Sequence, residues 1–301
     1  MNMKRRYNLA VLILMMAITS QSPSFGQANP MGALYFQNQF LGNPAYAGLH
    51  QGLDLNLGIR RQWSNIPGSP TLQTATADYA ITPKAGVGIN VYNDRSGLFK
   101  RTRTMASYAY HLPLSGEEGH NLSFGLALGV MSERLSSEDI KGDQGDISVQ
   151  NFNQRETYMD GDFGMAYTSK GFNLQGVLPN MKAFFKKDNF INSIDLVNFY
   201  TAASYKFNLS GGSNGIGLEP KVVYHDIKGF DNIVDAGINL TLADNKLNFL
   251  GMYHSSKSTT FGMGLNYGTF GFQGIYTSAT SALSNYTNGN FEISLKLKVL
   301  R

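Results

Sequence analysis

The feature that most constrains the fold of this chain is a period-two alternation of apolar with small or polar residues. Neighbouring side chains of a β-strand point to opposite faces, so this alternation predicts strands with one apolar face. Residues 121–133 show it most clearly, because Leu126 and Leu128 alternate with Ala127 and Gly129. The same pattern recurs in residues 231–242, 259–267 and 291–300. The chain is therefore predicted to be all-β.

The alternating segments have the length of transmembrane strands. About fourteen of them, each roughly 8 to 12 residues long, follow one another, and a tilted strand of about this length crosses a bilayer. They run over residues 53–63, 72–82, 85–93, 102–112, 121–133, 157–168, 172–178, 196–208, 215–226, 231–242, 247–255, 259–267, 271–279 and 291–300.

The lengths of the connections separate a membrane barrel from a soluble β-sandwich, which also alternates. If the first strand leads outward, the three longest connections, 134–156, 179–195 and 280–290, all fall on the outside. The connections on the other side, such as Pro83-Lys84, are short. Bacterial outer-membrane barrels have short periplasmic turns, long external loops and an even strand count. We therefore predict a single antiparallel transmembrane β-barrel over residues 51–301.

The N-terminus has the three parts of a secretory signal peptide. Residues 1–26 contain a basic start at Lys4, an apolar run over 9–18 and a small-residue exit. The mature chain is predicted to begin near Gln27. Residues 27–50 precede the first strand, and two interpretations stay open for them: a hatch that folds inside the lumen, or a disordered periplasmic lead.

Composition excludes several classes of protein. The chain has no cysteine, which excludes a disulfide scaffold, a thiolate metal site and a lipid anchor on cysteine. Its 25 basic residues fall to 22 without the three of the signal peptide, against 21 acidic residues. A nearly neutral mature chain gives no argument for binding nucleic acid.

No motif indicates catalysis or a cofactor. The five histidines show no metal-binding spacing, and alternation directs His111, His225 and His254 to the lumen, where polar side chains are ordinary. The acidic residues of the connection 134–156 lack the ordered spacing of a calcium loop, which favours a solvated loop. We therefore predict no catalytic, cofactor-binding or metal-binding residues, and no cofactor.

The connection 179–195 differs from the other predicted loops, because apolar and basic residues are mixed in it. Phe184 and Phe185 stand next to Lys186 and Lys187. Exposed apolar residues often mark a surface that binds a partner, but such residues also fold back into a barrel mouth. Both interpretations stay open.

Several short motifs occur in a fixed order between residues 35 and 97. They are Asn43-Pro44-Ala45-Tyr46-Ala47-Gly48, then Arg60-Arg61-Gln62-Trp63, then Pro70 to Ala80, and then Gly86 to Asp94. In this order the motifs resemble the PorP/SprF family of type IX secretion system membrane proteins. The resemblance is strongest over this third of the chain.

The resemblance implies a barrel in the cell outer membrane that is not an enzyme. Such a protein assists the secretion or surface anchoring of an adhesin-like partner with a C-terminal export domain, together with other secretion-system components, and some members support gliding motility. The arrangement is also similar to fatty-acid-transporter-type barrels, so the alternative is a transporter-like or porin-like barrel for a small solute.

The motif residues have structural interpretations of their own. Asn43-Pro44 favours an extended or turn conformation, and the small residues that follow suit close packing, so residues 43–48 are the candidate lumen plug if residues 27–50 form a hatch. Arginine binds carboxylates and stacks on aromatic rings, so Arg60, Arg61 and Trp63 are predicted to hold the hatch or an acidic residue of a partner.

Overall fold

A computed structural model gives the architecture of the chain. It describes residues 33–114, 120–136, 152, 157–182, 197–210, 215–227, 232–279 and 287–299. The predicted signal peptide, the acidic residues Glu138, Asp139, Asp143 and Asp146, and the predicted partner residues Phe184, Phe185, Lys186 and Lys187 lie outside these ranges.

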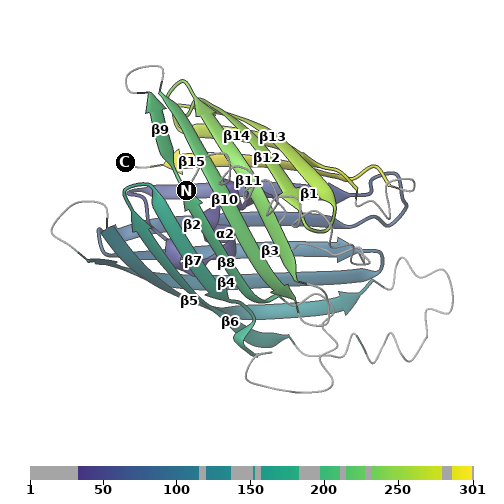
Figure 1. Cartoon of the computed structure of the whole chain (residues 1–301). Helices are drawn as coiled ribbons and strands as arrows, with labels where there is room; N and C mark the ends of the chain where they lie inside the picture. The colour runs from purple at the N-terminus through teal and green to yellow at the C-terminus, as the bar shows by residue number, and fades with distance from the viewer. Residues whose placement is uncertain are drawn as a thin grey trace, which may run out of the picture.

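The described strands form one sheet that closes on itself (Figure 1). Each strand pairs antiparallel with its neighbours, β15 pairs with β1, and β10 pairs with β11. Both β8 and β9 pair with β10, so the two short strands together occupy one position in a 14-strand barrel. The strands are β1 (Leu53–Gln62), β2 (Thr71–Thr82), β3 (Ala85–Ser96), β4 (Phe99–Pro113), β5 (His120–Leu135), β6 (Tyr158–Ser169), β7 (Phe172–Leu178), β8 (Val197–Tyr205), β9 (Phe207–Ser210), β10 (Ile216–Ile227), β11 (Ile233–Leu242), β12 (Leu247–His254), β13 (Ser258–Tyr267), β14 (Phe270–Thr277) and β15 (Asn290–Val299).

The predicted fold class is therefore confirmed, including the count of about fourteen strands, and one strand position is interrupted. The single segment predicted over 196–208 is interrupted between β8 and β9. Pro220 of β10 lies opposite this interruption, and proline has no N–H to donate to a sheet ladder. The Lys206 amide instead donates to the Gly171 carbonyl oxygen at 2.8 Å.

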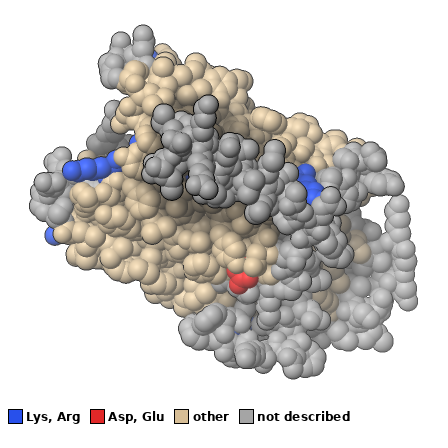
Figure 2. Space-filling view, in the orientation of Figure 1, with Lys and Arg blue, Asp and Glu red and all other residues tan. Residues whose placement is uncertain are grey.

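The two faces of the wall differ as the alternation predicts. Leu126 and Leu128 are 42% and 52% exposed, whereas Ala127 between them is 2% exposed. Apolar side chains cover the outer face, and Figure 2 shows few charged atoms on the visible wall between the two ends of the barrel. The inner face buries polar side chains such as Lys221, Asp235 and Gln273. An apolar outside and a polar inside suit a barrel surrounded by lipid.

The three longest connections all fall at one end of the barrel. Residues 83–84, 170–171, 243–246 and 268–269 connect strands at one end, which also holds the end of β15. The strand ends that lead into the long connections 136–157, 179–196 and 278–289 are at the other end, together with the short turns 97–98 and 255–257. By the rule that outer-membrane barrels turn briefly on the periplasmic side, the short-turn end is periplasmic.

Residues 33–49 lie inside the ring of strands (Figure 1) and are called here the luminal segment. The segment comprises η1 (Leu34–Phe36), α2 (Gln39–Gly42) and η2 (Pro44–Tyr46). All three are single turns, and two have side-chain caps: Asn38 accepts from the Leu41 amide at α2, and Asn43 accepts from the Ala45 amide at η2. Pro44 stands at the first position of η2, where its missing N–H costs nothing.

Candidate functional site in the barrel lumen

The buried residue Asn43 fixes the luminal segment to the wall. Its amide nitrogen donates to the Met165 carbonyl oxygen at 3.2 Å and to Gln175 Oε1 at 3.1 Å. Its side-chain oxygen accepts from the Ala45 amide at 2.9 Å. The side chain therefore satisfies partners on β6, on β7 and within its own turn. A buried amide with all these contacts made is a specific anchor.

Three glycines on the inner face of the wall admit the backbone of the segment. A Cβ added to Gly86 would overlap the Ala47 carbonyl oxygen, and one added to Gly125 would overlap the peptide unit between Pro44 and Ala45. A Cβ added to Gly164 would overlap the side-chain oxygen of Asn43. We call Gly86, Gly125 and Gly164 the glycine seat. It spans β3, β5 and β6.

Polar side chains of the wall also bind residues 46–48 of the luminal segment. The Tyr46 hydroxyl donates to Asn173 Oδ1 at 2.7 Å, and burial raises the pKa of this hydroxyl, which keeps it neutral. The Gly48 amide donates to Asp78 Oδ2 at 3.0 Å. His111 Nε2 lies 3.1 Å from the Ala47 carbonyl oxygen, and because a carbonyl only accepts, this nitrogen is the donor.

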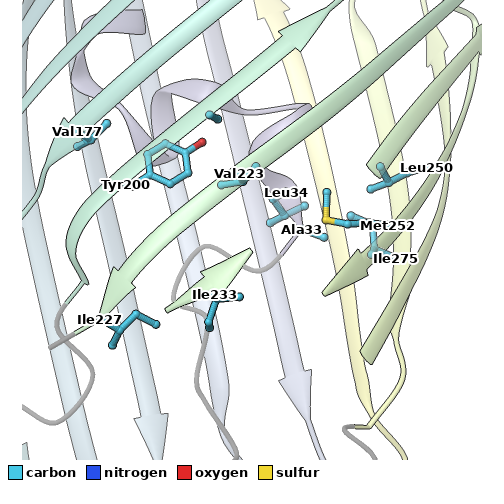
Figure 3. Close-up of a cluster of buried hydrophobic side chains, with 11 residues drawn as sticks. Ala33, Leu34, Val177, Tyr200, Val223, Ile227, Ile233, Leu250, Met252 and Ile275 are labelled. Carbon is cyan, nitrogen blue, oxygen red and sulfur yellow. The ribbon is translucent and has the colours of Figure 1, made fainter. Parts of the chain in front are cut away.

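The start of the luminal segment contacts side chains of β15 and β10. The Ala33 amide donates to both carboxylate oxygens of Glu292 at 3.3 Å, and Lys221 Nζ lies 4.6 Å from the centre of the Phe36 ring. Ala33 and Leu34 belong to an apolar cluster on the lumen side of the strands (Figure 3). Its other members include Val177, Tyr200, Val223, Leu250, Met252 and Ile275.

The structure separates the three residues predicted as one cluster at the outer end of β1. Arg60 is buried in the lumen, beside Leu34 and Glu292. Arg61 is exposed on the opposite face of the strand. Trp63 lies beyond the strand with a φ of 51°, and its amide donates to the Gly289 carbonyl oxygen at 2.8 Å. Only Arg60 is therefore placed to support the luminal segment.

A second set of charges organises the outer mouth of the lumen. Arg103 binds Asp162 through two hydrogen bonds of 2.8 and 2.6 Å and lies 3.5 Å from Asp160. The same carboxylates accept from the backbone amides of Asn180 and Lys182, at 2.8 and 3.1 Å. The beginning of the connection after β7 therefore folds back onto the mouth.

Two histidines share one carboxylate in the lumen. His225 Nε2 lies 3.2 Å from Asp235 Oδ2, and His254 Nδ1 lies 2.8 Å from Asp235 Oδ1. His254 Nε2 contacts the Thr260 hydroxyl at 2.7 Å, which resembles an acid–base–nucleophile chain. Asp235 and Thr260 are completely buried, so a substrate has no access to this hydroxyl.

The described ranges contain neither a metal-binding group nor a membrane-crossing helix. No group of three or more histidines or carboxylates there is arranged to hold a metal ion. No helix in the described part of the chain is long and apolar enough to cross a membrane. Sequence reasoning predicted that His225 and His254 face the lumen but missed the cluster with Asp235. The cross-strand register that pairs Asp235 with His254 is the signal that would have revealed it.

Comparison with solved structures returns membrane barrels. The monoaromatic hydrocarbon channel CymD is 12% identical, covers 92% of this chain and 95% of its own, and has a TM-score of 0.48. The toluene transporter TodX of P. putida is 10% identical over 87% of this chain and 94% of its own, with a TM-score of 0.47. The outer membrane protein Omp33 of Acinetobacter baumannii is 8% identical over 84% of this chain and 100% of its own, also with a TM-score of 0.47.

These similarities concern overall shape, and the barrel itself rests on the strand pairing. No curated protein sequence matches the chain. The family model described as type IX secretion system membrane protein PorP/SprF matches residues 24–297. The predicted family and the predicted location in the outer membrane are both confirmed. The chain thus belongs to the PorP/SprF family of type IX secretion system membrane proteins.

Proposed function

We propose that this protein assists the secretion or surface anchoring of an adhesin-like partner protein that carries a C-terminal export domain. It acts with other components of the type IX secretion system and catalyses no reaction of its own. The observation that supports the proposal most directly is the occupied lumen, where residues 33–49 lie on the glycine seat.

The contacts of the luminal segment suit a scaffold better than an open pore. Backbone atoms of residues 43–48 fill the space that side chains leave free at Gly86 and Gly125. Asn43, Ala45 and Ala47 are completely buried, so a solute meets closely packed protein at this level. A barrel closed in this way presents its two ends as binding surfaces, which suits a protein ligand.

The second candidate function is transport of a small solute. A cavity of about 540 Å³ at the short-turn end supports it, since ligand pockets commonly measure roughly 300–1,000 Å³. Phe36 and Gln37 of the luminal segment line this cavity. Transport therefore requires the luminal segment to move, whereas anchoring does not.

Deleting the gene in the bacterium that carries it separates the two functions. We expect the deletion strain to lose adhesin-like proteins from its surface and culture medium, as measured by mass spectrometry of both fractions. Complementation with the intact gene should restore them, and the tagged protein should co-purify with such a partner. A strain with unchanged secretion and reduced uptake of small solutes would replace the secretion proposal with the transport one.

A further inference from the structure

The cavity at the short-turn end has an unusual charge. Four lysines, Lys206, Lys246, Lys296 and Lys298, line it against the carboxylates of Glu219 and Asp244. We call this cavity the periplasmic vestibule. Lys296 pairs with Asp54 at 2.8 Å, whereas Lys206, Lys246 and Lys298 form no ion pair within the described part of the chain. The vestibule therefore offers cations to an incoming ligand.

Neutral polar groups lie between these cations. Asn239 and Asn248 line the vestibule from β11 and β12, and Thr241 and Asn266 add a hydroxyl and a third amide. A carboxamide both donates and accepts hydrogen bonds, as a peptide unit does. Lysines suit the carboxylates of a ligand, and carboxamides suit its backbone.

The direction of the lysine side chains indicates which ligand can reach them. Alternation along β15 places Lys296 and Lys298 on the same face as the buried Glu292, which points into the lumen. Lipid headgroups surround the outside of a barrel, whereas these two lysines face its inside. A flexible protein segment from the periplasm can enter through the short-turn end.

We propose that the periplasmic vestibule binds an extended, acidic peptide segment of a periplasmic partner protein. Charge complementarity carries the proposal: the lining lysines outnumber the lining carboxylates, and an acidic peptide supplies the missing charges. Phe36 and Gln37 also line the vestibule, so a bound peptide touches the luminal segment. The proposal adds a second ligand site to the function proposed above, and it is independent of which protein is exported.

The test measures peptide binding to the full-length protein in detergent micelles or nanodiscs, without any secretion assay. The probe is a fluorescent eight-residue peptide that alternates Asp with Ser, and its control replaces each Asp by Asn. The variant K246Q/K298Q removes two vestibule charges. Its matched control is K100Q/K257Q, which removes two lysines near the turns of the opposite end.

We expect the acidic peptide to bind the unchanged protein and K100Q/K257Q equally. Binding to K246Q/K298Q should weaken at least about fivefold, because charged contacts at an exposed mouth contribute modestly. Affinity should fall as salt rises, and the Asn peptide should not bind.

Three results would overturn the proposal. The first is equal binding of the acidic peptide to K246Q/K298Q and to the unchanged protein. The second is no binding of the acidic peptide at millimolar concentration. The third is binding that disappears when nanodiscs contain phosphatidylglycerol, because the vestibule would then be a lipid site. These measurements use purified protein and a synthetic peptide, so their results do not depend on whether the protein assists secretion. Each of the two proposals can therefore fail without the other.

Discussion

Two walls of the lumen differ in what fills the space beside them. On the wall formed by β3, β5 and β6, the glycine seat has no side chains, and the backbone of residues 43–48 lies directly on Gly86 and Gly125. On the wall formed by β10 to β13, side chains fill the lumen, and Asp235 binds both His225 and His254. The wall with the glycine seat leaves space that the luminal segment fills. The wall formed by β10 to β13 fills its own space with side chains that bind one another. Changes to the two walls should therefore have different effects.

The largest effect is expected for Gly125→Ala in the glycine seat. Its Cβ would overlap the backbone between Pro44 and Ala45, and overpacking of a closed interior costs about 3 kcal/mol or more when backbone must move. We expect the segment to leave the lumen, which should appear as raised conductance in planar lipid bilayers. Gly274→Ala is the matched control, since a Cβ there meets nothing within 4 Å. Equal conductance of the two variants would contradict the claim that the glycine seat holds the segment in the lumen.

A smaller effect of a different kind is expected for Asp235→Ala on the opposite wall. It leaves two buried imidazoles without their shared carboxylate, at a cost of about 2–3 kcal/mol. The free energy of unfolding should fall, as followed by the fluorescence of Trp63, the single tryptophan, during guanidinium unfolding in micelles. Conductance should stay at the level of the unchanged protein. A conductance increase like that of Gly125→Ala would remove the distinction between the walls.

Asn43→Ala tests the anchor that fixes the luminal segment to β6 and β7. The change deletes three hydrogen bonds and leaves the buried Gln175 amide oxygen without its partner, at a cost of about 2 kcal/mol. We expect faster proteolysis of the luminal segment, measured by mass spectrometry of the fragments. Asn93→Ala offers a comparison, because that exposed side chain is bonded only near the outer rim. Identical cleavage rates for the two variants would argue against the anchor.

The smallest effect is expected for Tyr46→Phe. It removes one hydrogen bond, from the hydroxyl to Asn173, and keeps the buried ring, so the cost is about 1 kcal/mol. Burial raises the pKa of this hydroxyl, so the phenolate forms in the unfolded chain before it forms in the folded one. The unchanged protein should therefore lose stability above about pH 10, the usual pKa of tyrosine, more steeply than the variant. Equal slopes in unfolding experiments across pH 8–11 would contradict this.

The strands were predictable from the sequence because alternation and connection length are local properties. Arg60 and Arg61 are neighbours in a strand, and neighbouring side chains of a strand point to opposite faces. The same alternation therefore predicts that these two arginines do not form one cluster. The interruption opposite Pro220 was also signalled, since proline weakens a central strand.

The contacts inside the lumen were not predictable, since they join residues far apart in sequence. The contact of Asn43 with Gln175 depends on the register of every strand between them. The pairing of His225 with Asp235 likewise depends on how β10 and β11 align. A single sequence indicates which face a side chain occupies, but not its height in the barrel.

The glycine seat has a consequence for assembly. Residues 43–48 touch glycines on the inside of strands that follow them in the chain, and the ring closes only where β15, the last strand, pairs with β1. We expect residues 43–48 to reach the glycine seat while the ring is still open, so that the final strand pairing encloses them.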